Sequence, residues 1–165
     1  MRLQQDVSTI FCNGHKDPYI FCNGVQVWPT KVVETHSIYL EFEEEFAGYM
    51  TVQGLWWNGF NITEDIVLEA QYKSGSSWNT ISQSDLADML STSTGKAIYC
   101  SAIFITINYN TFSQFKWRTQ TYYAPEKKVT IRVRENYTSG TEYVAEKEVT
   151  QAPNTTFTVN RGDTI

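Results

Sequence analysis

Three Asn-Gly dipeptides constrain the fold of this chain more than any other feature of its sequence. They stand at Asn13-Gly14, Asn23-Gly24 and Asn58-Gly59, each flanked by apolar or aromatic residues. A two-residue type I′ turn needs a positive φ at both central positions, and Asn-Gly adopts this conformation at little steric cost. The dipeptides therefore predict tight antiparallel hairpins.

Alternation of apolar and polar residues predicts further strands. Ile38, Leu40 and Phe42 share one face of such a strand, and comparable runs recur at roughly the eight-to-twelve-residue spacing of sandwiches. We expect an all-β protein, an antiparallel β-sandwich of the jelly-roll or immunoglobulin-like kind. The predicted core consists of Ile38, Leu40, Phe42, Leu68, Ala70, Tyr72, Ile103, Ile105, Val129, Ile131 and Val133.

One short helix is predicted near residues 83–91. Ser84 is a suitable N-cap, and the acidic Asp85 and Asp88 suit the positive end of a helix. Leu86 and Met89 fall on one helical face and supply the apolar contact.

The length of 165 residues fits a single sandwich domain spanning residues 1–165. Within it, Ile10 to Gly14 recurs ten residues later as Ile20 to Gly24, which predicts an N-terminal β-meander over residues 1–33. Pro18 interrupts its middle strand, because proline donates no hydrogen bond to a ladder. Residues 126–165 are richer in Thr, Glu and Lys, and we interpret them as a C-terminal β-hairpin extension.

Charge and hydropathy limit the partners. The net charge is −5, which argues against nucleic acid because phosphate binding needs a basic surface. No apolar stretch reaches the length of a membrane-spanning helix, and the polar start of the chain lacks a signal-peptide core. We therefore expect no signal peptide, no transmembrane segment and synthesis in a host cytoplasm; proteins or glycans are compatible partners.

Catalytic motifs are weak. His15 and His36 lack metal-like or triad-like spacing, and we expect both in surface or half-buried loops. A Cys22/His36 or Cys12/His15 dyad leaves a cysteine-dependent enzyme open as an alternative. The acidic run from Glu41 to Glu45 fits either a Ca²⁺ site or a solvated strand end. We predict no enzyme activity, no cofactor and no metal.

Aromatic residues, which make up 15% of the chain, are the stronger functional signal. Trp56 and Trp57 are consecutive on a strand, so one faces the core and the other faces solvent or a partner. Exposed rings stack on sugars or bury at interfaces, whereas buried rings fill a sandwich core. The predicted partner-binding residues are Trp57, Phe60, Trp117, Tyr122 and Tyr123.

Two resemblances accompany these patterns. The segment Tyr72-Lys73-Ser74-Gly75-Ser76-Ser77-Trp78 resembles the strand–turn–Trp element of discoidin-like, galactose-binding jelly rolls, which implies a carbohydrate-binding module. An immunoglobulin-like sandwich fits nearly as well, although its Cys–Trp–Cys pattern is missing.

The acidic, aromatic-rich, all-β profile is also similar to that of small virion proteins of tailed phages. This resemblance implies a non-catalytic structural or attachment protein of a virion-like assembly, of the head-decoration, fibre or tail-adaptor type. Its partners would be copies of itself or other virion proteins, and its location the virion. The alternative is a carbohydrate-binding β-sandwich that uses exposed aromatic residues.

Overall fold

The computed structural model describes residues 11–12, 15–16, 20–22, 25–28, 32–43, 50–91, 96–119, 127–152 and 154–165. Its contacts divide the chain into two compact units, Met1–Val32 and Val33–Ile165, and each is described by itself. The expectation of one domain over residues 1–165 stays a prediction.

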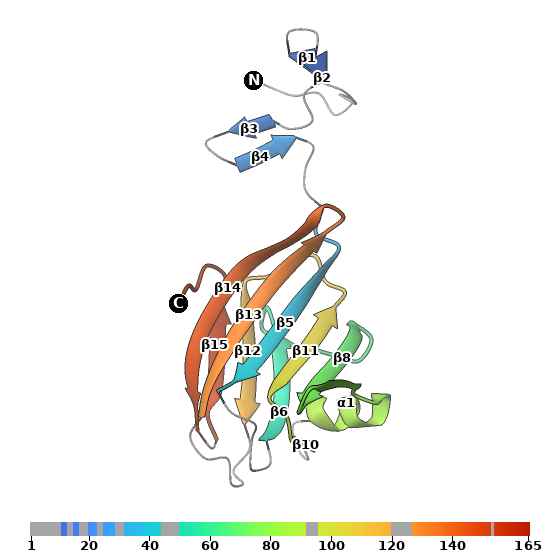
Figure 1. Cartoon of the computed structure of the whole chain (residues 1–165), viewed down its shortest axis with the longest axis vertical. Helices are drawn as coiled ribbons and strands as arrows, with labels where there is room; N and C mark the ends of the chain where they lie inside the picture. The colour runs from blue at the N-terminus through green and yellow to red at the C-terminus, as the bar shows by residue number, and fades with distance from the viewer. Residues whose placement is uncertain are drawn as a thin grey trace. The chain divides into compact units, whose positions relative to one another are not determined.

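The first unit contains two hairpins (Figure 1). β1 (Phe11–Cys12) pairs with β2 (His15–Lys16), and β3 (Ile20–Cys22) pairs with β4 (Val25–Trp28), both antiparallel. The strand pairs flank the first two Asn-Gly dipeptides, which themselves lie outside the described residues. Among the residues described, these are two separate two-stranded sheets rather than one three-stranded meander.

The second unit is an antiparallel sandwich of two sheets, as predicted (Figure 1). The six-stranded sheet has the order β14 (Gly140–Gln151), β13 (Lys127–Tyr137), β5 (Thr35–Phe42), β11 (Ala102–Ile107), β8 (Val67–Ser74), β9 (Ser77–Thr80). The five-stranded sheet has the order β10 (Lys96–Ile98), β6 (Met50–Trp57), β12 (Gln114–Thr119), β15 (Thr156–Asn160), with β7 (Phe60–Asn61) paired to β6. One apolar core, drawn from both sheets, lies between them.

The predicted core is buried except at two positions on β8. Tyr72 is half-buried against the core, and Leu68 is 58% exposed. In the β8–β11 ladder Glu69 lies opposite Thr106 and Val67 opposite Ile107, so Leu68 has no opposite residue. This β-bulge inverts the alternation and turns Val67 inward in place of Leu68.

The helix α1 spans Gln83–Leu90, close to its predicted position. Its N-cap is Ser82 rather than Ser84, because Ser82 Oγ accepts the backbone hydrogen bond of Asp85 at 3.2 Å. Leu86 and Met89 are buried, and the helix packs on β6 and β10. No helix within the described residues is long and apolar enough to cross a membrane.

The segment predicted as a C-terminal extension is built into the sandwich. β13 and β14 form a long hairpin, but β13 also pairs with β5 from Val129 to Asn136. β15 crosses to the other sheet and pairs with β12. The segment thus supplies strands to both sheets.

The third Asn-Gly dipeptide forms the predicted type I′ hairpin between β6 and β7. Asn58 and Gly59 have φ values of 53° and 86°, and Trp57 lies opposite Phe60. The Asn58 side chain also accepts hydrogen bonds from Ser113 N at 2.7 Å and Ser113 Oγ at 2.9 Å. The turn therefore also holds the connection between β11 and β12 in place.

Candidate functional site

The consecutive pair Trp56 and Trp57 separates the core from the outer surface of the five-stranded sheet. Trp57 is 0% exposed; its Nε1 donates to Thr111 O at 2.6 Å, and its ring lies 4.9 Å from that of His36. Trp56 is half-buried on the opposite side of the strand. This corrects the prediction that Trp57 contacts a partner, because a ring enclosed by the core offers no face to a ligand.

The other predicted binding residues are also not free platforms. Trp117 is 1% exposed, with its ring 5.2 Å from that of Phe157. Phe60 is half-buried against the core, and its ring lies 5.1 Å from that of Tyr109. Tyr122 and Tyr123 lie outside the described residues. The alternative that Trp57 and Trp117 fill the core is the one that the structure shows.

Trp56 lies down over its own strand. Gly54, at a φ of +85°, leaves the space for this, since a Cβ atom there would lie 2.8 Å from Trp56 Cη2. The β6–β12 ladder is irregular at this point, with Trp117 opposite Leu55 and Thr119 opposite Val52. Both the left-handed backbone and the contact require glycine at position 54.

Beside Trp56 lies a shallow depression with a volume of about 380 Å³. The described residues that line it are Trp56, Gly59, Lys116, Arg118 and Thr156. Lys116 is the cross-strand neighbour of Trp56, and Arg118 is that of Thr156. Because Trp117 points into the core, its neighbours Lys116 and Arg118 both point outward.

Lys116 and Arg118 differ in their ion pairing from other cations of the chain. Ion pairs join Lys128 to Glu148, Arg132 to Glu41 and Glu146, Lys147 to Asp163, and Arg161 to Glu135. Lys116 and Arg118 form no ion pair with any residue that the structure describes, and no acidic residue is among the described residues that line the depression. The site therefore combines one aromatic ring with two positive charges that no described carboxylate neutralises.

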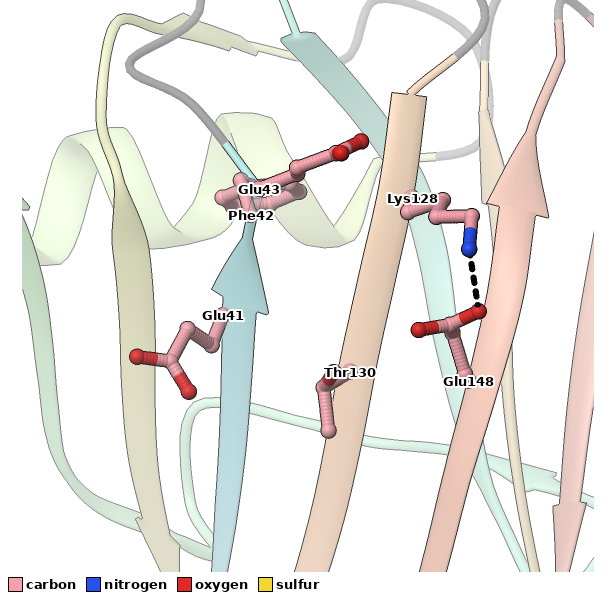
Figure 2. A pocket seen from close by; sticks show the side chains of 6 residues that line it. All are labelled: Glu41, Phe42, Glu43, Lys128, Thr130 and Glu148. Atoms are coloured by element: carbon pink, nitrogen blue, oxygen red, sulfur yellow. Dashed lines mark ion pairs between the residues drawn. The ribbon is translucent and has the colours of Figure 1, made fainter. Parts of the chain in front are cut away.

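A second depression, of about 340 Å³, lies over the acidic end of β5 (Figure 2). Figure 2 shows the Glu41 and Glu43 carboxylates pointing in different directions, and Lys128 Nζ lies 2.9 Å from Glu148 Oε1. In the described part of the chain no group of three or more His, Cys, Asp or Glu side chains is placed to hold a metal ion. Glu44 and Glu45 of the acidic run lie outside the described residues, so both the Ca²⁺ site and the solvated strand end stay predictions.

His36 belongs to a buried polar network, which corrects its predicted place in a surface or half-buried loop. It lies on β5 and is 0% exposed; its Nδ1 is 2.5 Å from Tyr109 O and its Nε2 is 3.3 Å from Glu135 Oε1. Tyr137 Oη donates to Glu135 Oε2 at 2.6 Å. The Arg161 guanidinium donates to both oxygens of Glu135, at 2.5 and 3.1 Å.

This network sets the ionisation of Glu135. Burial raises the pKa of the carboxyl group, but the hydrogen bonds from Arg161, Tyr137 and His36 outweigh burial and lower that pKa from 4.5 to about 2. Glu135 is therefore a carboxylate at neutral pH. With His36 enclosed and Glu135 fully engaged by neighbours, the arrangement serves to join β5, β13 and the end of β15.

The tripeptide Arg161-Gly162-Asp163, which matches an integrin-binding sequence, forms the turn after β15. Gly162 has a φ of +87°, and Asp163 N donates to Asn160 O at 3.0 Å. Arg161 is held by Glu135, and the Asp163 carboxylate lies 3.2 Å from Lys147 Nζ. Both charged side chains thus form ion pairs with other residues of the chain.

The outer face of the six-stranded sheet carries a second exposed aromatic group. Trp78 is 42% and Tyr143 62% exposed. The Arg134 guanidinium lies 5.8 Å from the centre of the Phe104 ring and 5.6 Å from that of Tyr143. The contacts of Arg134 with two rings order this part of a partly apolar surface.

Comparison with known proteins gives no assignment: no family model, no curated protein and no solved structure matches this chain.

Proposed function

We propose that this chain is a non-catalytic attachment module that binds a glycan on the outer face of its five-stranded sheet. The observation that carries the proposal is Trp56, an outward ring in one depression with Lys116 and Arg118, two cations without an ion-pair partner among the described residues. The C–H groups of a sugar ring carry slight positive charge and suit the negative face of an indole.

The dimensions and chemistry of the depression fit this use. Its volume of about 380 Å³ falls in the range of small-ligand sites. The hydroxyl of Thr156 and the two cations supply hydrogen-bonding groups around the ring. The described lining holds no carboxylate or imidazole that would act as a general acid or base, which supports binding rather than catalysis.

Trp56→Ala is expected to weaken glycan binding by roughly tenfold or more, because a central Trp commonly dominates a small contact surface. A glycan array would first identify ligands of the wild-type protein, and isothermal titration calorimetry would then compare the variants. Trp78→Ala, which removes an exposed Trp from the other sheet, is the matched control and should bind as the wild type does. Unchanged binding by the Trp56 variant would contradict the proposal.

A second candidate function is structural: assembly with copies of itself or with other proteins of a virion-like particle. The exposed Trp78 and Tyr143 on the six-stranded sheet favour it, since aromatic residues are enriched where proteins associate. The two functions use opposite faces of the sandwich, so one protein can perform both.

The double variant Trp78→Ser/Tyr143→Ser is expected to shift the protein from an oligomer toward the monomer. Size-exclusion chromatography with light scattering measures this shift, with Trp56→Ala as the control on the other sheet. A wild-type protein that stays monomeric at high concentration would count against self-assembly through this face.

A further inference from the structure

We infer that the glycan bound beside Trp56 is acidic: a pyranose carrying a carboxylate or sulfate group, which Lys116 and Arg118 bind. This inference rests on the proposed glycan-binding function and specifies its ligand. The common chemistry of the two groups is a compact oxyanion attached to a sugar ring.

The charge pattern supports an anionic ligand. The whole chain has a net charge of −5, yet this depression is lined by two cations and by no described carboxylate. Elsewhere Arg132 is neutralised by two glutamates, and Lys128 by one. A ligand oxyanion would supply the counter-charge that the described residues do not provide at Lys116 and Arg118.

The spacing of the side chains suits one sugar unit. Trp56 and Lys116 are direct cross-strand neighbours, so their Cα atoms lie roughly 5 Å apart. Lys116 and Arg118 are two residues apart on β12, which places their Cα atoms roughly 7 Å apart on one face. A ring stacked on Trp56 thus has both cations beside it.

The two cations have different parts in this arrangement. The planar guanidinium of Arg118 can donate two parallel hydrogen bonds to one carboxylate or sulfate, which fixes the orientation of that group. The Lys116 ammonium acts as a mobile point charge next to the ring. Together they favour an acidic sugar over its neutral counterpart.

A single strand of nucleic acid is the other ligand that combines rings with phosphates, but the surface suits it less well. Such binding uses successive aromatic platforms along an extended basic groove. Trp56 is the aromatic residue in the described lining, and the two cations stand on one strand. An oligonucleotide is therefore included as a test rather than as the proposed ligand.

The experiment compares three sugars by calorimetry: tetragalacturonate, its carboxyl-reduced neutral form, and a sulfated galactose tetrasaccharide. The wild-type protein is expected to bind at least one acidic sugar about tenfold more tightly than the neutral one. Raising NaCl from about 0.05 to 0.5 M should reduce this preference, because salt screens exposed charges. Comparing the two acidic sugars tells whether carboxylate or sulfate is preferred.

The double variant Lys116→Gln/Arg118→Gln should lose the preference for the acidic sugar and keep the weaker binding of the neutral one. Lys128→Gln/Arg132→Gln, which removes the same charges from a strand of the other sheet, is the matched control and should keep the preference. Circular dichroism melting of each variant confirms that it is folded.

The outcomes distinguish failure of the acidic-ligand inference from failure of the proposed glycan binding. Equal binding of acidic and neutral sugars, abolished by Trp56→Ala, would overturn the acidic ligand and leave glycan binding intact. Binding of none of the three sugars, with no array ligand sensitive to Trp56→Ala, would overturn both. Tighter binding of a short oligothymidylate than of any sugar would also overturn both.

Discussion

Trp57→Ala is expected to lower the free energy of unfolding by about 3 to 5 kcal/mol, whereas Trp56→Ala should lower it by less than about 1 kcal/mol. The two residues are adjacent, but Trp57 is fully enclosed and Trp56 faces outward. Removing Trp57 leaves a cavity beside Phe112, whose ring lies 4.6 Å away, and removes the shorter of two side-chain hydrogen bonds to Thr111 O, leaving the one from Asn58 Nδ2.

Urea denaturation of the two variants, followed by far-ultraviolet circular dichroism, measures this difference. In the glycan-binding experiment the order of the two variants should be reversed. Folded Trp56→Ala protein should lose more affinity than folded Trp57→Ala protein, because it lacks the ring on which the ligand stacks. Equal losses of stability in both variants would mean that the assignment of one ring to the core and one to the surface is incorrect.

This pair also shows what alternation can and cannot predict. The strand period requires Trp56 and Trp57 to face opposite sides, and the sequence predicts that much. It does not say which side is the core, because both residues are the same amino acid. That is decided by the ladder, in which Phe115 lies opposite Trp57 and Lys116 opposite Trp56.

Lys116, one of two charged residues on β12, is the sequence signal that would have selected the correct ring. Burying the charged ammonium of Lys116 without a partner costs far more than burying the single indole N–H of Trp117. Lys116 therefore belongs on the outer face of the sheet and Trp117 on the core face. Trp56, the cross-strand neighbour of Lys116, belongs on the outer face too. This reasoning requires knowing that β12 pairs with β6. A single sequence does not show that pairing, because β7 to β11 lie between the two strands in the chain.

Other differences from the predicted structure have the same origin in long-range pairing. Alternation along β8 places Leu68 in the core, but the bulge opposite β11 exposes it. His36 and Glu135 are far apart in the chain and meet because β13 pairs with β5. Arg161 reaches Glu135 because the turn after β15 bonds to β14, with Gly162 N donating to Val144 O at 2.8 Å. By contrast, the Asn58-Gly59 turn and α1 depend on local residues and are close to their predicted positions.

Glu135→Gln is expected to lower the stability of the protein by about 3 kcal/mol near pH 7 and to have little effect near pH 2. The carboxylate is 5% exposed and accepts hydrogen bonds from both Arg161 nitrogens and from Tyr137. Glutamine has nearly the same shape but lacks the charge that holds Arg161 in place.

The sign of the pH dependence follows from the direction of the pKa shift. The folded-state pKa of Glu135 is about 2, below the ordinary value of 4.5, so folding favours the carboxylate. Its contribution to stability is fully present above about pH 4.5 and is lost as the pH falls toward about 2. The variant lacks this group, so the difference between the two proteins should shrink across that window.

Urea denaturation of both proteins from about pH 7 to about pH 2 isolates this contribution, because the other acidic groups titrate in both and cancel in the difference. Glu146→Gln, which removes a more exposed carboxylate paired with Arg132, is the control and should change stability by less than about 1 kcal/mol at any pH. A Glu135→Gln difference that stays constant down to about pH 2 would show that Glu135 is stabilising through its shape and not its charge. The ion pair with Arg161 would then not be what ties the end of β15 to the six-stranded sheet.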